Sequence, residues 1–141
     1  MPENEKRITV GVGVMVFKDG KVLLAKRKGS FGDGEYAWPG GKMEYMESFE
    51  ECARREVREE TGMEIKNVRF LRLMNLKHYA PWHFVDLELV ADWQSGEPQL
   101  LEPDKFDEWQ WYDFDKLPEP MLYPQYSSIE AYKTGKNYFD N

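Results

Sequence analysis

Apolar side chains occupy every second position at the start of the chain, namely Ile8, Val10, Val12, Val14 and Val16. This period of two is typical of a β-strand with one buried face. Gly11 and Gly13 fall on the other face, where they leave room for another group to approach the backbone. Asp19 and Gly20 then favour a tight turn into the apolar segment KVLLAKR. The pattern therefore predicts a β-hairpin over residues 8–27.

The next segment, GSFGDGEYAWPGGK at residues 29–42, contains five glycines and a proline. Such a composition is typical of a loop. A flexible surface connection is the simplest interpretation. A functional loop is the alternative, because the segment leads towards a predicted helix and binding residues often lie on loops held by a rigid scaffold.

A helix is predicted between Ser48 and Gly62. Ser48 followed three positions later by Glu51 forms a capping box, in which each side chain bonds a free backbone N–H of the first turn. Gly62 suits the left-handed conformation that ends many helices. At about 100° per residue, the inward face carries Phe49, Cys52, Ala53, Glu56, Glu59 and Glu60. The solvent face carries Glu50, Glu51, Arg54 and Arg58, with Arg54 able to pair with Glu50.

Three glutamates, Glu56, Glu59 and Glu60, thus complete the predicted inward face. Acids in the last turn of a helix reduce its stability, because that end already carries partial negative charge. Arg55 can offset Glu59 one turn away. Two interpretations remain open: the acids emerge from the core into solvent, or they bind a hard divalent cation such as Mg²⁺, which prefers oxygen ligands.

Composition and charge narrow the classes of protein. The 141 residues fit one domain, 1–141, and 41% hydrophobic residues argue against disorder. A net charge of −7 without a basic run argues against a long nucleic acid as partner, because clustered Lys and Arg bind phosphate backbones. Cys52 is the only cysteine, which fits a reducing compartment. No stretch reaches membrane-spanning length and MPENEKR lacks an apolar signal region, so a cytoplasmic protein without a membrane partner is expected.

The segment GKMEYMESFEECARREVREETGM, residues 41–63, resembles the Nudix box at every defined position of that motif. The matching residues are Gly41, Glu47, Arg55, Glu56, Val57, Glu59, Glu60, Gly62 and Met63. Nine specified positions at fixed spacing make this a specific signal. The flanking segments WPGGK, WQWY and KLP also resemble the family, and the resemblance covers most of residues 8–125.

The resemblance implies an α/β protein with the Nudix fold, an α/β/α sandwich with a mixed β-sheet and a loop-helix-loop catalytic motif. Members of the family hydrolyse a nucleoside diphosphate linked to another group, by attack of water on the pyrophosphate. Small negatively charged substrates of this kind are commonly bridged to carboxylates by divalent metal ions.

The resemblance also assigns roles within the box. The implied ligands of Mg²⁺, for which Mn²⁺ can substitute, are Glu56, Glu59, Glu60 and the carbonyl of Gly40. Among these, Glu56 and Glu60 are the principal ligands, and Glu59 is a further ligand or the base for water. Arg55 and Glu47 are implied to form an ion pair that orients the catalytic helix.

Within the family, the chain resembles small MutT-like nucleoside triphosphate pyrophosphatases, including the animal and plant nucleotide diphosphatases. The shared segments are LLAKRKGS, SFEECARRE, LEPDK and LPEPMLYP. Such enzymes release pyrophosphate and a nucleoside monophosphate from (deoxy)nucleoside triphosphates, including oxidised or modified ones. Two alternatives stay open: a hydrolase of another nucleoside diphosphate derivative such as a nucleotide sugar, and a non-catalytic nucleotide-binding module. Dimeric relatives suggest a homodimer.

Candidate substrate-binding residues lie mostly outside the box, and they are Arg27, Trp38, Gly41, Lys42, Asp86 and Tyr123. Arg27 ends the second strand and could meet phosphates, or be an ordinary charged strand end. Trp38 and Tyr123 could flank a base or simply pack. Asp86 shares a strand face with Phe84 and Glu88 in HFVDLELV, and could accept from a guanine-like base or face solvent.

Several polar and aromatic residues carry weaker signals. His78 and His83 could act as general bases, but ordinary surface or partly buried histidines are the favoured interpretation. One acid among Asp104, Asp107 and Glu108 could supply an additional metal ligand or base. The C-terminal aromatics are expected to pack on the sheet or to form a subunit interface, and they are Tyr126, Tyr132, Tyr138 and Phe139.

Overall fold

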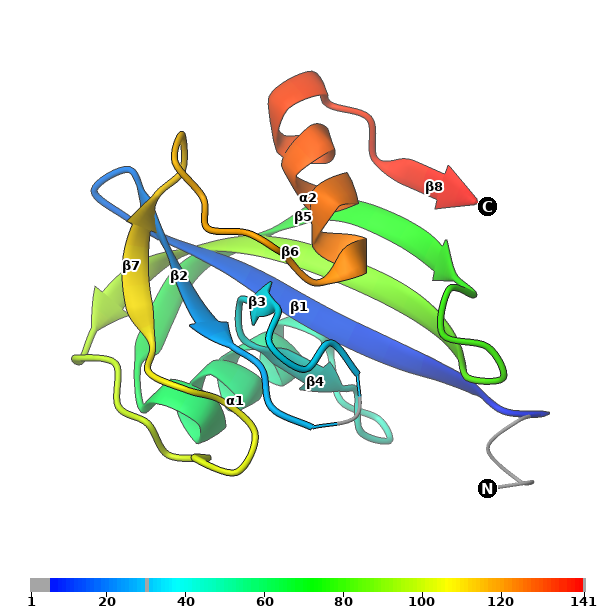
Figure 1. Cartoon of the computed structure of the whole chain (residues 1–141), viewed down its shortest axis with the longest axis horizontal. Coiled ribbons are helices and arrows are strands. Elements are labelled where there is room, and N and C mark those ends of the chain that lie inside the picture. Colours follow the sequence, from blue (N-terminus) through cyan, green and yellow to red (C-terminus); the bar gives the residue numbers. More distant parts are fainter. Residues whose placement is uncertain (1–5, 30, 141) are drawn as a thin grey trace.

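The computed structural model describes residues 6–29 and 31–140, in which a mixed sheet lies between two helices (Figure 1). The strands are β1 (Ile8–Lys18), β2 (Lys21–Lys26), β3 (Tyr36–Ala37), β4 (Gly40–Lys42), β5 (Glu64–Leu76), β6 (His83–Ser95), β7 (Gln110–Asp113) and β8 (Tyr138–Asp140). The helices are α1 (Phe49–Thr61) and α2 (Tyr123–Thr134). Among the described residues the sheet has the order β3-β2-β1-β6-β5-β8, with β4 paired to β1 and β7 paired to β2.

The predicted hairpin is confirmed. Strands β1 and β2 pair antiparallel, and Lys18 lies opposite Lys21 across the turn. Asp19 and Gly20 both adopt positive φ, 52° and 77°, as a two-residue hairpin turn requires. The buried face of β1 is shorter than predicted: the valines from Val12 onwards are buried, whereas Ile8 is 62% exposed because the strand begins beyond the core.

Strand β1 also pairs with β6, and these two strands run parallel. The register sets Gly11 beside Asp86 and Gly13 beside Glu88. The antiparallel pairing of β6 with β5 then extends the sheet, with bulges in β5. The space left by the two glycines is therefore filled by two acids of the neighbouring strand.

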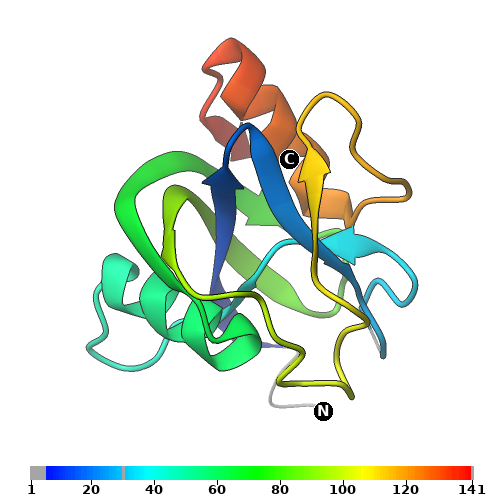
Figure 2. The same cartoon turned by 90° about the vertical axis from the view of Figure 1, so that its left-hand side faces the viewer.

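The two helices cover opposite faces of the sheet (Figures 1 and 2). Beneath α1, its buried Cys52, Ala53 and Val57 join one apolar cluster with the valines of β1. A second cluster on the other face contains Met15, Trp38 and Met121. This layering confirms the expected α/β/α fold.

Helix α1 ends as the sequence predicts. Ser48 accepts a hydrogen bond from the Glu51 amide and the Glu51 side chain accepts one from the Ser48 amide, which completes the capping box. Gly62 adopts φ 78° at the other end. The outward pair is also present, since Arg54 lies 2.8 Å from Glu50. The prediction that Phe49 faces inward is wrong: it is 53% exposed, and the buried face of α1 begins at Cys52.

The described residues of the glycine-rich segment, 29 and 31–42, include two short strands where a loop was predicted. These strands are β3 and β4, and β4 pairs with β1. A Cβ on Gly40 would lie 2.6 Å from the carbonyl oxygen of Val12, so only glycine permits this close pairing. Residues 40–42 are thereby fixed to the sheet a short distance before α1 begins.

The C-terminal region packs on the sheet. Helix α2 contacts β5, and β8 pairs parallel with β5. Phe139 is buried there, whereas Tyr126, Tyr132 and Tyr138 stay largely exposed. No helix in the described part of the chain has the length and apolar content needed to cross a membrane.

Candidate active site

Helix α1 turns two carboxylates towards the glycines that precede it. Glu56 and Glu60 lie one turn apart and are only 9% and 4% exposed. The amide of Gly40 donates to Glu60 Oε1 at 3.0 Å. A Cβ on Gly41 would lie 2.4 Å from the Glu56 carboxylate, so the glycine backbone makes room for the acid.

Arg55 organises the acids around it. Its Nε and one terminal nitrogen bond both oxygens of Glu47, at 2.6 and 3.0 Å, a bidentate geometry. Its other terminal nitrogen lies 2.8 Å from Glu56 and 3.2 Å from Glu59. Hydrogen bonding from Arg55 lowers the pKa of Glu47 to about 2. The ion pair implied by the motif is present, and it reaches further than Glu47 alone.

Glu59 does not lie on the buried face that was predicted for it. Its side chain is 51% exposed, and its contact is the ion pair with Arg55. The reason is geometric, because Glu59 stands at the edge of the stripe that Glu56 and Glu60 define. Glu59 therefore presents a half-exposed carboxylate that is held by Arg55.

An acid outside the box, Glu102, adds negative charge near Glu56 and Glu60. Burial raises the pKa of both carboxyl groups, and the charge of Glu102 raises each further. Glu102 follows β6 in the segment LEPDK. The sequence had pointed instead to its neighbours, but Asp107 pairs with Lys28 at 3.5 Å, and Asp104 and Glu108 are exposed. The shared LEPDK segment was the signal that could have indicated Glu102.

The donors present fit a hard divalent cation that is completed by water and substrate. Across residues 6–29 and 31–140, no group of three or more His, Cys, Asp or Glu side chains is arranged to hold a metal ion alone. Mg²⁺ rarely needs such a cage, because it is usually held by one or two carboxylates together with waters and substrate phosphates. Glu60 supplies such a carboxylate: it is buried and forms no ion pair with any described residue. A buried charge of this kind requires a partner.

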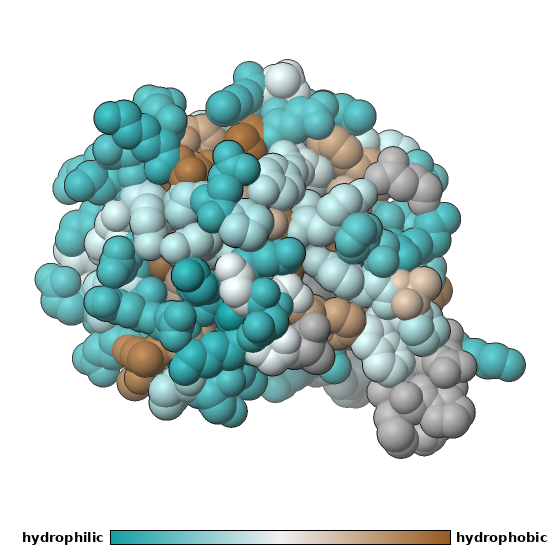
Figure 3. Space-filling view, viewed as in Figure 1, coloured by the Kyte–Doolittle hydropathy of each residue, from teal (hydrophilic) through white to brown (hydrophobic). Residues whose placement is uncertain are grey.

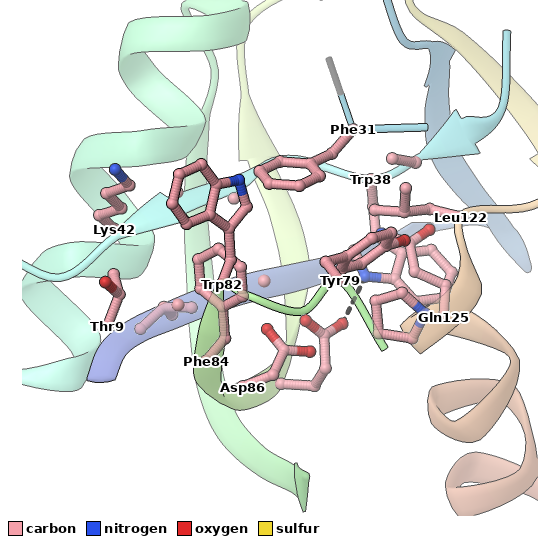
Figure 4. Close-up of a pocket in the computed structure, with 18 of the residues that line it drawn as sticks. Thr9, Phe31, Trp38, Lys42, Tyr79, Trp82, Phe84, Asp86, Leu122 and Gln125 are labelled. Atoms are coloured by element: carbon pink, nitrogen blue, oxygen red, sulfur yellow. Dashed lines mark hydrogen bonds between the residues drawn. The ribbon is translucent and has the colours of Figure 1, made fainter. Parts of the chain in front are cut away.

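A cavity of about 460 Å³ opens beside these glycines. Figure 4 shows Thr9 and Lys42 on the side towards α1, and Leu122 and Gln125 beside the start of α2. Aromatic residues form part of the wall, and they are Phe31, Tyr79, Trp82 and Phe84. The volume and the aromatic wall suit a planar organic group.

Two acids of β6 form the polar floor of the cavity, and each is held by a different partner. Arg72, with no exposed side-chain surface, donates to Asp86 Oδ2 at 2.8 Å. The indole N–H of Trp38 donates to Glu88 Oε1. Burial raises the pKa of Asp86 and Arg72 offsets part of that rise. Burial, together with the charge of Asp86, raises the pKa of Glu88 to about 8.

The structure brings most predicted substrate-binding residues to this cavity. Those that line it are Arg27, Trp38, Gly41, Lys42 and Asp86, and Gly40, predicted as a metal ligand, lines it as well. Burial lowers the pKa of Arg27, whose Nε donates to the Phe31 carbonyl at 2.8 Å. His83 also lines the cavity, and its Nε2 is 2.6 Å from Asn75 Oδ1.

The prediction that Tyr123 flanks a base has no support in this geometry. Tyr123 is absent from the cavity lining, and its ring stacks on His78 with centroids 3.8 Å apart. It is the first residue of α2, and it projects outward while Leu122 and Pro124 on either side line the cavity. Arg72, Glu88 and Gln125 also belong to the cavity or its floor, and the sequence pattern did not identify them as site residues.

The raised pKa of Glu88 gives a prediction for stability. A carboxyl group whose pKa rises from 4.5 to about 8 on folding binds its proton more tightly in the folded chain. Folding stability therefore falls as pH increases between those values. Glu88→Gln cannot ionise and still accepts from Trp38, so its advantage in Tm over wild type should grow between pH 4.5 and about 8. Thermal melts across this range measure it, and a constant difference would contradict the expectation.

Comparison with known proteins places this site in a family. The model of the NUDIX domain matches residues 7–132. The chain therefore belongs to the Nudix hydrolase family. The matched residues include Glu56, Glu60 and all the residues that line the adjoining cavity.

Two curated relatives and one solved structure illustrate the similarity. The chain is 39% identical over 116 residues to an NAD-capped RNA hydrolase NudC of Haemophilus influenzae, covering 79% of this chain but 41% of the relative. It is 34% identical over 111 residues to an oxidized purine nucleoside triphosphate hydrolase of Danio rerio, covering 78% of this chain and 69% of the relative. A MutT NUDIX hydrolase from Burkholderia pseudomallei superposes with a TM-score of 0.84 at 31% identity, covering 89% of this chain and 98% of that structure.

Proposed function

We propose that this protein hydrolyses (deoxy)nucleoside triphosphates, including oxidised or modified purine nucleotides, to nucleoside monophosphate and pyrophosphate, with Mg²⁺ or Mn²⁺ as cofactor. One observation carries the proposal. The buried carboxylates Glu56 and Glu60 adjoin a cavity that combines an aromatic wall with hydrogen-bonding acids. The two carboxylates suit a phosphate chain bridged by a metal ion, and the cavity suits a heteroaromatic base.

Glu56 and Glu60, with the carbonyl of Gly40 and with Glu59 as a further ligand or base, would hold the metal ion. A bound divalent ion supplies positive charge that polarises the phosphate and acidifies water. Arg55 fixes the orientation of Glu56 through their 2.8 Å ion pair. The other residues of the site bind and orient the substrate through their positions and charges.

Cationic side chains line the cavity where a phosphate chain would enter. Lys42 and Arg27 both contribute to its wall, as does the backbone of Gly41. Positive charges at these positions offset the negative charge of the substrate. Trp38 is buried and holds Glu88, so its contribution to binding is to shape the floor.

Asp86 supports a preference for guanine-like bases. Asp86 lines the cavity, and Arg72 donates to its Oδ2. The other carboxylate oxygen, Oδ1, accepts no hydrogen bond from the described residues. A free carboxylate oxygen accepts from a ring N–H or an amino group. A site built to bond such a donor discriminates strongly against bases that lack it.

The relatives support two related activities. The Danio rerio relative is named for oxidized purine nucleoside triphosphates, which agrees with the proposal. The Haemophilus influenzae relative is named for NAD-capped RNA, so another nucleotide derivative is the alternative substrate. A nucleotide sugar as substrate belongs to the same alternative. The second alternative is a nucleotide-binding module without catalytic activity.

A substrate panel with product detection tests the proposal. Purified protein with Mg²⁺ is incubated with dGTP, dATP, an 8-oxo-purine triphosphate, a nucleotide sugar and NAD, and the products are separated. Pyrophosphate plus monophosphate supports the proposal. Cleavage of only NAD or the nucleotide sugar supports the alternative, and no cleavage of any compound supports a binding module. Asp86→Asn should reduce kcat/KM for dGTP selectively, by about 1–3 kcal/mol in transition-state stabilisation.

A homodimer with twofold symmetry is expected as well. Several aromatic side chains remain on the surface of the C-terminal region, including Tyr132 at 45% and Tyr138 at 63% exposure. On the face shown in Figure 3, hydrophobic residues form separate patches within a mostly hydrophilic surface. Light scattering at micromolar concentration should give twice the chain mass, and the mass of one chain would contradict the expectation.

A further inference from the structure

The segment between β6 and β7 passes the C-terminal end of α1 (Figures 1 and 2). The Gln99 amide donates to the carbonyl of Thr61, the last residue of α1, at 2.8 Å. A few residues further along, the turn 102–105 is closed by its own backbone, because the Lys105 amide donates to the Glu102 carbonyl at 3.0 Å. The segment therefore carries an acid and a lysine to the helix that bears the two buried carboxylates.

Further hydrogen bonds fix this turn to the end of β2. The Lys28 amide donates to the Lys105 carbonyl and the Asp107 amide donates to the Lys26 carbonyl, both at 2.8 Å. Lys28 also uses its side chain, since its Nζ donates to the Pro103 carbonyl at 3.0 Å and lies 3.5 Å from Asp107. The position of the turn therefore depends on backbone atoms and on Lys28, and not on the side chain of Lys105.

The ammonium group of Lys105 is available to an anion. Its ion pair among the described residues is with Glu102 Oε1 at 3.7 Å, and the Lys105 side chain is 62% exposed. This separation is too long for a hydrogen bond, and Oε1 has no hydrogen-bond partner in the described part of the chain. An exposed pair of this kind contributes little to stability. An incoming anion can therefore replace Glu102 as the partner of Lys105.

Two cations act on the buried carboxylate of Glu60. Burial raises the pKa of Glu60, and the charge of Lys105 lowers it. Burial lowers the pKa of Arg27, and the charge of Glu60 raises it. Arg27 lines the cavity, whereas Lys105 does not. An acid that would hold the metal ion is thus influenced by one cation in the cavity wall and by another outside the cavity.

The chemistry of pyrophosphate release determines where the outer phosphates lie. With the base in the cavity, the α–β anhydride has to reach the metal-binding carboxylates, so the β- and γ-phosphates lie beyond them and outside the cavity. Hydrolysis forms one P–O bond to water and breaks the anhydride P–O bond, and it releases monophosphate, pyrophosphate and a proton. Negative charge develops on the departing pyrophosphate, and a cation placed beside it stabilises that charge.

We propose that Lys105 binds the β- and γ-phosphates, the group that leaves as pyrophosphate. This inference rests on the proposed function and supplies the leaving group with a partner outside the cavity. On substrate binding the ammonium group moves from Glu102 to the phosphates, which suits lysine because its compact charge sits on a flexible stem. Lys105 consequently favours substrates that end in free phosphates over those whose outer phosphate is esterified to a sugar or a second nucleoside.

Lys105→Met tests the role through binding alone. The affinity for a dGTP analogue with a non-hydrolysable α,β-imido bridge should fall about 10-fold, which corresponds to about 1.4 kcal/mol. The affinity for dGMP, which ends at the α-phosphate, should stay unchanged. Calorimetric titration in Mg²⁺ measures both affinities. Tm without ligand should also stay unchanged, because other groups hold the turn, and Lys105→Arg should retain most of the affinity for the analogue.

Product inhibition of dGTP hydrolysis gives a second readout. Inorganic pyrophosphate should inhibit Lys105→Met about 10-fold more weakly than wild type, whereas inhibition by dGMP should be equal in the two proteins. The matched control is Lys116→Met, which removes an exposed lysine after β7. This control should change neither the affinities nor the inhibition.

The outcomes separate the inference from the proposed function. Equal affinities of Lys105→Met and wild type for the imido analogue overturn the inference, as does an equal loss of affinity for dGMP, which would indicate a structural role. A wild type that binds the analogue but hydrolyses no triphosphate overturns the proposed function instead, and the binding comparison still decides the role of Lys105. A wild type that does not bind the analogue overturns both.

Discussion

Glu56→Gln and Glu60→Gln should each lower turnover in Mg²⁺ by about 100-fold or more, which corresponds to about 2.7 kcal/mol of activation free energy. Each substitution keeps the size of the side chain but removes the charge that a hard cation requires. The fold should survive, because both acids are buried close together and loss of one charge relieves their repulsion. Steady-state kinetics at saturating Mg²⁺, together with Tm, measure both effects.

The matched control on the same helix is Glu50→Gln. Glu50 lies on the solvent face, where it pairs with Arg54 at 2.8 Å. This exposed pair contributes about 0–1 kcal/mol, so activity and stability should stay close to wild type. Near-normal rates for both Glu56→Gln and Glu60→Gln would show that the metal-binding assignment is wrong.

Arg72→Met should destabilise the protein by about 3–5 kcal/mol, the usual effect of removing one partner of a buried ion pair. Arg72 is fully buried, and it bonds both Asp86 and the carbonyl at the start of α2. Without it, Asp86, whose side chain is 15% exposed, has no counter-charge. Urea unfolding of wild type and variant gives the difference.

The surface pair formed by Arg69 and Asp92 supplies the comparison. Their nitrogen and oxygen lie 3.3 Å apart, and the two side chains are 49% and 35% exposed. Arg69→Met should therefore cost about 1 kcal/mol or less. The double variant Arg72→Met/Asp86→Leu should regain much of the stability, since apolar residues often replace a buried ion pair at little cost. If Arg72→Met lowered the free energy of unfolding no more than Arg69→Met, the buried ion pair between Arg72 and Asp86 would not stabilise the cavity floor.

Local sequence signals predicted the helix and the hairpin well. The capping box at Ser48 and the turn at Asp19–Gly20 act within a few residues, so their geometry is determined locally. The motif spacing also led directly to Glu56 and Glu60. Glu59 shows the limit of this reasoning, because helical periodicity cannot tell how far a stripe of residues remains covered at the end of a helix.

The cavity floor could not be predicted in the same way. Alternation along β5 is broken by bulges between Lys66 and Arg69 and between Phe70 and Arg72. A bulge shifts the face to which later side chains point, so a period of two does not identify Arg72 as inward. Likewise, the short strand β4 consists of Gly40, Gly41 and Lys42, whose side chains carry no alternating pattern.

The parallel pairing of β1 with β6 has a consequence for folding. Ile8 lies beside His83, so this contact joins segments separated by about half of the chain. Closing so long a loop costs chain entropy before any contact compensates for it, and non-local pairings of this kind slow folding. The local β1–β2 hairpin and helix α1 are therefore expected to form early, and Asp86 and Glu88 reach Gly11 and Gly13 later. Protection of β6 amides in pulsed hydrogen exchange should consequently appear together with the ability to bind nucleotide.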